Sequence, residues 1–389
     1  MPYVEGNSAI RAMFEEGARL AEKYGRENVY DFSLGNPSVP APAEVNQAIK
    51  DIIEEEDSLL IHGYNQSNSG YADVRETVAQ HLNSLHGTRF GVQNIVMTVG
   101  AASGLNVAIK TLLDPGEEIL AFAPYFVEYG NYAKNHGAVL KVVPADVVTF
   151  RPNLREMENM ITEKTRAVII NSPNNPTGVI YGEDFIKKLA ETLKQKQLEL
   201  GRDIYIIADE PYRELAYDDA EVPYLTKYYD NTVVAYSWSK SLSLPGERIG
   251  YLVFPSEMSD FGNAIDAANI ANRVLGYVNA PTLIQRVVAR CIDCKTDIDA
   301  YDRNRKALYN GLNEIGYTCV YPEGAFYMWV KAPGGDDKAF CAKAKEHNIL
   351  IVPGSSFACP GYVRIAYCVA HETIVNSLPA FAKVYEEYK

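Results

Sequence analysis

Lys240 is the residue whose surroundings in this sequence most clearly suggest chemistry. It stands alone among small residues in the segment SWSK (residues 237–240), directly after an apolar run. Arg248 follows eight residues later, just before a second apolar run. A lysine in a largely apolar site beside an anion can have a lowered pKa and form a Schiff base with a carbonyl group. The pattern therefore predicts a nucleophilic amine next to an anion site.

Three kinds of group indicate the anion site. The segment VGAASGLN (residues 99–106) places small residues at a strand-to-helix turn, which leaves the N–H groups of the helix start free to hold an anion. Ser237 and Ser239 supply hydroxyl groups, and Arg248 supplies a guanidinium. Together these groups are what binding a phosphate requires.

Two further segments place polar residues after predicted strands. SPNNPTG (residues 172–178) reads as a rigid turn that presents Asn174 and Asn175, and DEPYREL (residues 209–215) has Asp209 at a strand end and Tyr212 three residues on. A carboxylate in such a place is costly unless a cation pairs with it, and a protonated pyridine nitrogen would be such a cation. Pyridoxal phosphate has a phosphate, a pyridine nitrogen, a phenolic oxygen and an aldehyde, so it matches the whole set.

Each feature alone has an ordinary structural explanation. Tight turns use Gly and Ala, NNPTG could be a simple loop, and Asp-Glu-Pro could cap a helix. An isolated Lys240 would usually be solvated, and Arg248 would usually form a surface salt bridge. Only the combination indicates a pyridoxal phosphate site.

The chain resembles the class I/II (fold type I) pyridoxal-phosphate-dependent aminotransferases and is similar to aspartate and aromatic aminotransferases. The resemblance covers nearly the whole length. The matching motifs occur in the family's order: LGNP, GYNQSNSGYADVRETVA, VGAASGLN, PYF, SPNNPTG, DEPYREL, SWSK with GERIGY, and VRIAY. SPNNPTG followed by D-E-x-Y, S-x-S-K and an arginine eight residues later is a highly specific combination.

The resemblance implies a role for each matching residue. Lys240, Asp209 and Tyr212 would be catalytic: Lys240 would form the Schiff base and move the proton between the substrate Cα and C4′ of the cofactor, and Asp209 would pair with the ring nitrogen. Arg364 in VRIAY would bind the substrate α-carboxylate, with Gly35 and Asn175 nearby. The other cofactor contacts would be the backbone at Ala101 and Ala102, Phe126 against the ring, Asn175 and Tyr212 at the phenolic oxygen, Ser237, Ser239 and Arg248 at the phosphate, and Tyr64 from a partner subunit.

Two positions depart from the family pattern. Phe126 stands where many relatives have Trp or Tyr, and because Phe can still stack, we expect only an altered substrate fit. Trp238 is bulkier than the usual residue between the two serines, and the sequence offers no account of it.

These residues require an α/β scaffold. Strand-like runs at 94–99, 117–122, 138–143, 166–171, 203–209, 232–237 and 249–254 alternate with helical segments, and several are continuously apolar, as in strands covered on both faces. This favours a mostly parallel sheet flanked by helices, with ligands bound beyond the carboxyl ends of the strands. We expect a large cofactor-binding domain over residues 45–282. Residues 1–44 and 283–389 are expected to form a smaller, discontinuous α+β domain.

Composition excludes several classes of protein. The 389 residues are 47% hydrophobic and 22% charged, with a net charge of −13 and a pI near 5.1, which argues against a nucleic-acid or anionic-membrane surface. No apolar run approaches the roughly 18 residues of a membrane span. The first 25 residues read as an amphipathic helix without an export signal, so we expect a cytoplasmic location.

Six cysteines are too sparse for a disulfide framework, and no metal site is expected. Cys291 and Cys294 form a C-x-x-C, which could be redox-active or metal-binding. It lies within a long helical pattern with no second Cys/His pair at zinc spacing, so we interpret it as two ordinary helix positions.

The predicted function is transamination between an L-amino acid and a 2-oxo acid by a ping-pong mechanism. A C–S lyase or an aminocyclopropane-carboxylate-synthase-like lyase is the alternative, because such enzymes share the same cofactor residues, and a non-catalytic pyridoxal-phosphate-sensing module is a remote one. If Tyr64 completes the neighbouring site, the enzyme is a homodimer with shared active sites. The sequence leaves the substrate open: Arg273 could bind a distal carboxylate, but a surface or interface arginine is the commoner case.

Overall fold

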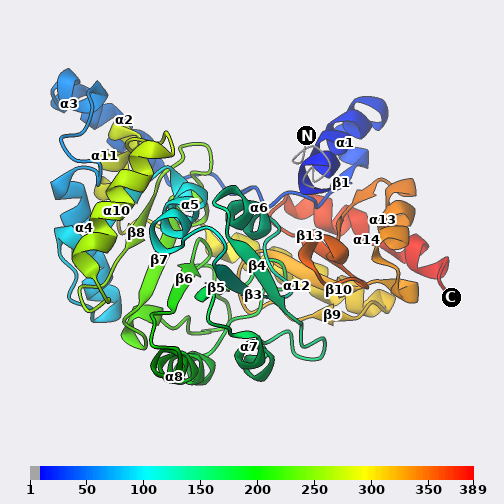
Figure 1. The fold of residues 1–389 in the computed structure, drawn as a ribbon. Helices are drawn as coiled ribbons and strands as arrows, with labels where there is room; N and C mark the ends of the chain where they lie inside the picture. The colour runs from blue at the N-terminus through cyan, green and yellow to red at the C-terminus, as the bar shows by residue number, and fades with distance from the viewer. Residues whose placement is uncertain (1–8) are drawn as a thin grey trace.

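A seven-stranded sheet forms the centre of the structure, a computed structural model that describes residues 9–389 (Figure 1). The strand order is β2-β8-β7-β6-β5-β3-β4. Strand β8 is antiparallel to both of its neighbours, and the other pairs are parallel, so the predicted α/β fold with a mostly parallel sheet is confirmed. The strands are β2 (Ile95–Thr98), β3 (Glu118–Phe122), β4 (Val139–Val143), β5 (Thr165–Asn171), β6 (Tyr205–Asp209), β7 (Thr232–Ser237) and β8 (Gly250–Val253).

Helices cover both faces of this sheet, which explains why its strands are continuously apolar. In β5, Ala167 and Ile169 pack into the core on one face, and Val168 and Ile170 pack into the core on the other. The first face is covered by α5 (Gly100–Leu112), α6 (Glu128–Asn135) and α10 (Phe261–Val274). The second is covered by α2 (Ala43–Glu55), α3 (Ser58–His62), α4 (Ala72–His86), α7 (Leu154–Met160), α8 (Glu183–Leu200) and α11 (Thr282–Arg290).

A second region of sheet and helix lies beside the first, on the right in Figure 1. Its antiparallel sheet has the order β12-β13-β10-β9, and β1 pairs with β11 in a separate parallel ladder that joins residues 30–31 to residues 349–350. The strands are β1 (Tyr30–Asp31), β9 (Cys319–Val320), β10 (Tyr327–Lys331), β11 (Ile349–Leu350), β12 (Val352–Pro353) and β13 (Tyr362–Ala366). The helices are α1 (Ala9–Tyr24), α12 (Ile298–Ile315), α13 (Asp337–Glu346) and α14 (His371–Glu386).

The boundary between the two expected domains stays a prediction. Val287 and Val288 of α11, beyond the expected boundary at residue 282, belong to the same apolar core as α2 and α4. Helix α11 therefore packs with the helices of the first sheet, and the division into residues 45–282, and 1–44 with 283–389, stays a prediction.

The long helix predicted around the C-x-x-C is wrong. Helix α11 ends at Arg290, and α12 begins only at Ile298, so Cys291 and Cys294 lie in the connection between two helices. The start of α12 is fixed by its N-cap, Asp297, whose side chain accepts a 3.1 Å hydrogen bond from the backbone N–H of Ala300. All six cysteines are free, and no cluster of three or more His, Cys, Asp or Glu within residues 9–389 could hold a metal ion. None of the helices in that range combines the length and apolar character that crossing a membrane requires.

Candidate active site

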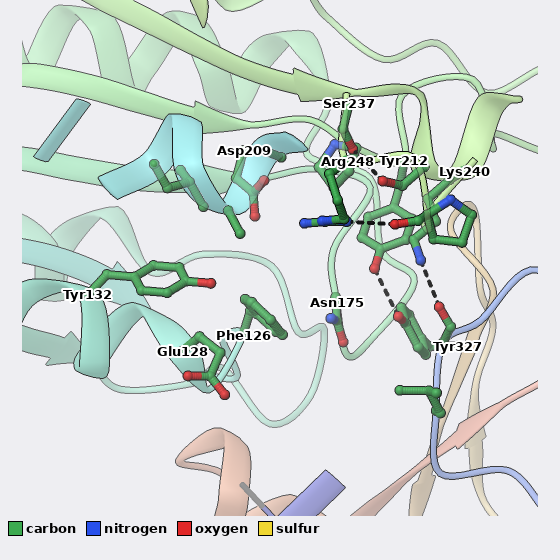
Figure 2. A pocket seen from close by; sticks show the side chains of 18 of the residues that line it. Phe126, Glu128, Tyr132, Asn175, Asp209, Tyr212, Ser237, Lys240, Arg248 and Tyr327 are labelled. Atoms are coloured by element: carbon green, nitrogen blue, oxygen red, sulfur yellow. Dashed lines mark hydrogen bonds between the residues drawn. The ribbon is translucent and has the colours of Figure 1, made fainter. Parts of the chain in front are cut away.

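The carboxyl ends of the sheet strands open onto a cavity of about 680 Å³ (Figure 2). Parallel strands bring their ends to one edge, and the antiparallel β8 brings its beginning to the same edge, since Ser237 pairs with Gly250. Of the residues predicted for the site, all but Tyr64 line this cavity. They are Gly35, Ala101, Ala102, Phe126, Asn175, Asp209, Tyr212, Ser237, Ser239, Lys240, Arg248 and Arg364.

Lys240 lies on the four-residue helix α9 (Trp238–Ser241), directly after β7. Its Nζ donates a 2.7 Å hydrogen bond to the carbonyl oxygen of Gly35. The pKa of Lys240 is lowered to about 8, mainly by burial; Cys368 opposes this lowering, and the nearby positive charges of Arg248 and Arg364 add to it. An appreciable fraction of this amine is therefore neutral, and able to act as a nucleophile or base, near physiological pH.

Asp209 ends β6 and is buried, with one oxygen held by a tyrosine. Its Oδ2 accepts a 2.5 Å hydrogen bond from Oη of Tyr129 on α6. Burial raises the pKa of Asp209 to about 7, the Tyr129 hydrogen bond opposes that rise, and the charge of Glu210 adds to it. Arg213 pairs with Glu210 at 2.7 Å, which balances that second charge. A cationic partner at this position would favour the ionised form of the buried Asp209 carboxyl group.

Tyr129 is a site residue that the sequence analysis missed. It lies three residues after Phe126, in the segment PYFVEY, and only the start of a helix at Glu128 turns it toward Asp209. The spacing to Phe126 was visible in the sequence, but the side chain's direction was not.

One part of the cavity, next to Lys240, is surrounded by the start of α5, the hydroxyl groups of Ser237 and Ser239, and Arg248. Gly100 has φ +78°, and a Cβ there would lie 3.0 Å from Nη2 of Arg248. Oγ of Ser237 donates to Oγ of Ser239 at 3.2 Å, and Arg248 is held by a 2.7 Å hydrogen bond from Nη1 to the carbonyl of Pro245. A helix start, two hydroxyls and a guanidinium in one place form an anion-binding group suited to phosphate.

Arg364 enters the cavity from the second sheet, on β13. It is buried; its Nη1 donates to Oδ1 of Asn175 at 3.0 Å, and its Nη2 donates to the carbonyl of Ser33 at 2.5 Å. The guanidinium carbon lies 4.5 Å from the ring centre of Tyr327 and 5.0 Å from that of Phe357. Its Nε is buried and has no hydrogen-bond partner among the described residues. The guanidinium lines the cavity, where a ligand carboxylate could accept hydrogen bonds from it.

Three aromatic residues, Tyr212, Tyr327 and Phe126, also line the cavity. Oη of Tyr212 and Oη of Tyr327 are 2.8 Å apart, and Figure 2 shows both rings next to Lys240. Phe126 lines the opposite side and packs edge-on against Tyr129, with 5.6 Å between ring centres.

The remaining sequence candidates lie outside the cavity. Trp238 is buried in the core, where it packs against the rings of Tyr236 and Tyr251 at 5.6 and 5.2 Å, so its bulk fills the core and not the site. Tyr64 is 89% exposed, just after α3. Arg273, on α10, is also outside the lining. The partner role expected for Tyr64 and the substrate role considered for Arg273 stay predictions.

The chain matches the family model described as aminotransferase class I and II over residues 27–380. An aspartate aminotransferase of Thermotoga maritima is 31% identical over 358 residues, covering 90% of each chain. Aromatic-amino-acid aminotransferase 2 of Thermococcus litoralis is 29% identical and covers 98% of this chain and 96% of its own.

Solved structures agree with these relatives. An aminotransferase from Eubacterium rectale is 51% identical, with a TM-score of 0.97 over 100% of this chain and 98% of its own. An aspartate aminotransferase from Thermus thermophilus, solved with maleate, is 25% identical, with a TM-score of 0.87 over 99% of both chains.

Proposed function

The chain belongs to the class I and II aminotransferases and is an enzyme that transfers amino groups, and we propose that it does so between an L-amino acid and a 2-oxo acid with pyridoxal phosphate in the cavity described above. The observation that carries this proposal is the convergence of Lys240, Asp209, Arg248 and Arg364, from three separate segments, on one cavity. They supply an amine with a lowered pKa, a buried carboxylate, an anion-binding guanidinium and a second guanidinium for a substrate.

Two observations support pyridoxal phosphate as the occupant. Oδ1 of Asp209 accepts no hydrogen bond from the described residues, although the side chain is only 5% exposed, which leaves it for a protonated ring nitrogen. Gly100 leaves open the space beside Arg248 that a Cβ would fill, at the start of α5, where a phosphate would fit. Ser237, Ser239 and the backbone at Ala101 and Ala102 would hold the phosphate, Phe126 would cover the ring, and Asn175 and Tyr212 would bind the phenolic oxygen.

The chain's own residues would do the following work. When bound, pyridoxal phosphate supplies an electron sink for the pair left when the substrate Cα loses its proton. Lys240 would remove the proton from the substrate Cα and return it at C4′ of the cofactor, a task suited to an amine with a pKa of about 8. Arg364, with Gly35 and Asn175 nearby, orients the α-carboxylate, and Asp209 holds positive charge at the ring nitrogen.

We also propose a homodimer in which Tyr64 reaches the site of the partner subunit. The strongly exposed Leu59, Leu60 and Tyr64, on and just after α3, form an apolar edge, which supports an interface there. Six free cysteines support the expected cytoplasmic location, because disulfides are rare in that compartment.

A donor panel tests the function. Purified enzyme loaded with pyridoxal phosphate is incubated with single L-amino acids and 2-oxoglutarate, and the new oxo acid and the new amino acid are both measured. We expect equal amounts of the two products and parallel-line, ping-pong kinetics. Lys240→Ala should lower turnover by at least ~100-fold and remove the yellow absorbance of the loaded enzyme, whereas Lys110→Ala, on the exposed side of α5, should change neither.

Two results would contradict the proposal. One is that Lys240→Ala keeps its turnover and colour. The other is that donors yield pyruvate and ammonia without amino transfer, which would indicate the lyase reaction instead.

A further inference from the structure

The cavity wall away from the cofactor-binding residues is acidic and apolar. The lining residues of the described chain include three cations, Lys240, Arg248 and Arg364, and the proposed function engages each of them. The remaining wall has the carboxylates of Glu15 and Glu128 and the side chains of Leu34, Leu105, Phe126 and Tyr132. Within residues 9–389, this wall therefore offers no further cation for a second substrate carboxylate.

Glu128 is the better placed of the two carboxylates. It lies in the first turn of α6, where the helix dipole stabilises a negative charge, and it is half-buried. Its Oε2 accepts a 2.8 Å hydrogen bond from Nδ2 of Asn131, and no Lys, Arg or His of the described chain pairs with it. Figure 2 shows Glu128 with Phe126 and Tyr132 on the side of the cavity across from Lys240. The carboxylate is thus oriented and available to a cation.

A second observation shows where a substrate would be anchored. Arg364 is 1% exposed, and its Nε has no partner among the described residues, while its other nitrogens are held by Asn175 and Ser33. A buried guanidinium that lines the cavity and has N–H groups that no described residue accepts points to a carboxylate ligand. This α-carboxylate anchor belongs to the second sheet, and Glu128 belongs to the helix layer of the first, so the two groups bound the substrate space from different elements.

We propose that the cavity selects amino donors whose side chain ends in a cation, an ammonium or a guanidinium, with Glu128 as the specificity-determining residue. The inference rests on the proposed transamination. A half-buried carboxylate favours a cationic side chain and disfavours a second carboxylate, since water screens the charges only in part.

Matched donors test this proposal, because they differ in charge and hardly in shape. Arginine is compared with citrulline, and lysine with 2-aminoheptanoate, whose terminal methyl group replaces the ammonium, in the loaded enzyme with one 2-oxo acid. We expect the cationic member of at least one pair to have a kcat/KM about tenfold higher or more, in line with a charge-assisted hydrogen bond. In Glu128→Gln, which keeps the size and the bond from Asn131, the ratio should fall to about 1–3. Glu191→Gln, on the exposed face of α8, is the matched control and should keep the original ratio.

A binding measurement separates this inference from the proposed function. The inert acids 5-guanidinopentanoate and 5-ureidopentanoate lack the α-amino group, so calorimetry reports their affinity without turnover. We expect the guanidino acid to bind about tenfold tighter to the parent enzyme, and the two to bind about equally to Glu128→Gln. Equal affinities in the parent enzyme, or a preference that survives Glu128→Gln, would overturn the inference even if transamination is observed. If no donor is transaminated but the binding difference depends on Glu128, the function fails and the cation site stands.

Discussion

Burial acts on both reactive groups of the cavity in the same sense, toward the neutral form. The amine of Lys240 has a pKa lowered to about 8, and the carboxyl of Asp209 has a pKa raised to about 7, although the two groups carry opposite charges when ionised. Near neutral pH each is therefore close to its titration point before a cofactor binds. The hydrogen bond from Tyr129 opposes the rise of the pKa at Asp209, and Cys368 opposes the lowering of the pKa at Lys240, to which the charge of Arg248 adds.

Asp209 should make the stability of the cofactor-free protein depend on pH. Its pKa is raised from 3.8 to about 7 on folding, so between these values the folded state holds more protons, and stability falls as pH rises. Above pH 7, this carboxylate costs up to ~4 kcal/mol. In the cofactor-free form, Asp209→Asn should therefore melt at a higher temperature than the parent at pH 8, and the advantage should shrink as pH falls toward 4.

Calorimetry or circular dichroism at several pH values checks this. Asp114→Asn, an exposed aspartate in the turn after α5, is the control and should show no such trend. If Asp209→Asn is no more stable than the parent at pH 8, the raised pKa of Asp209 is contradicted.

At the scale of elements, the site depends on how each strand connects to the next segment. Gly100 opens α5 at φ +78°, where an L side chain is strained, and its missing Cβ leaves room beside Arg248. Gly116, in the next turn, has φ +90°, but a Cβ at that position would meet no described atom within 4 Å. Substituting Gly116 would therefore introduce backbone strain alone, whereas substituting Gly100 would introduce the same strain and also fill space beside Arg248.

Gly100→Ala and Gly116→Ala should lose similar stability, about 1–2 kcal/mol each, because both force an alanine to positive φ. Only Gly100→Ala should also weaken pyridoxal phosphate binding, by about tenfold, since its methyl group displaces the guanidinium of Arg248 from the phosphate position. Thermal melting and absorbance titration of the cofactor-free protein measure the two effects. An equal loss of affinity in both variants would refute the phosphate position.

The sheet could be predicted from the sequence because strands covered on both faces are continuously apolar, as β5 and β7 are. The same reasoning placed Asp209, Asn175 and Lys240 at one edge. The helix prediction was wrong around Cys291, because the apolar periodicity continues past the end of α11 at Arg290. Only the N-cap at Asp297 marks the start of α12. Sequence reasoning also could not find Tyr129 or Glu128, because a helix face becomes informative only once the helix is docked.

On the scale of the whole molecule, the cavity lies where the seven-stranded sheet meets the second sheet. Lys240, Asp209 and Arg248 come from the first, and Arg364 comes from the second. Within one chain Tyr64 does not line this cavity, and its 89% exposure fits a contact made with a partner subunit.

Subunit mixing tests the shared site. Tyr64→Ala should lower pyridoxal phosphate affinity about tenfold, and Lys240→Ala should be inactive. In a heterodimer of the two, one site keeps Lys240 and receives an intact Tyr64 from the other chain. Refolded equal mixtures should therefore regain about a quarter of the parent activity at limiting cofactor, given that half of the dimers are mixed and each has one complete site. If mixtures show only the average of the two single variants, Tyr64 acts within its own chain or not at all.

The reversed direction of β8 has one more consequence. Lys240 and Arg248 sit at the two ends of a single short connection, between strands that pair at Ser237 and Gly250. The spacing of amine and guanidinium is thus a local property of one hairpin, insensitive to how the rest of the chain is disposed. Arg364 is not part of this hairpin. A shift of one sheet against the other would therefore change how the substrate carboxylate is bound, while the positions of Lys240 and Arg248, which would hold the cofactor, stay the same.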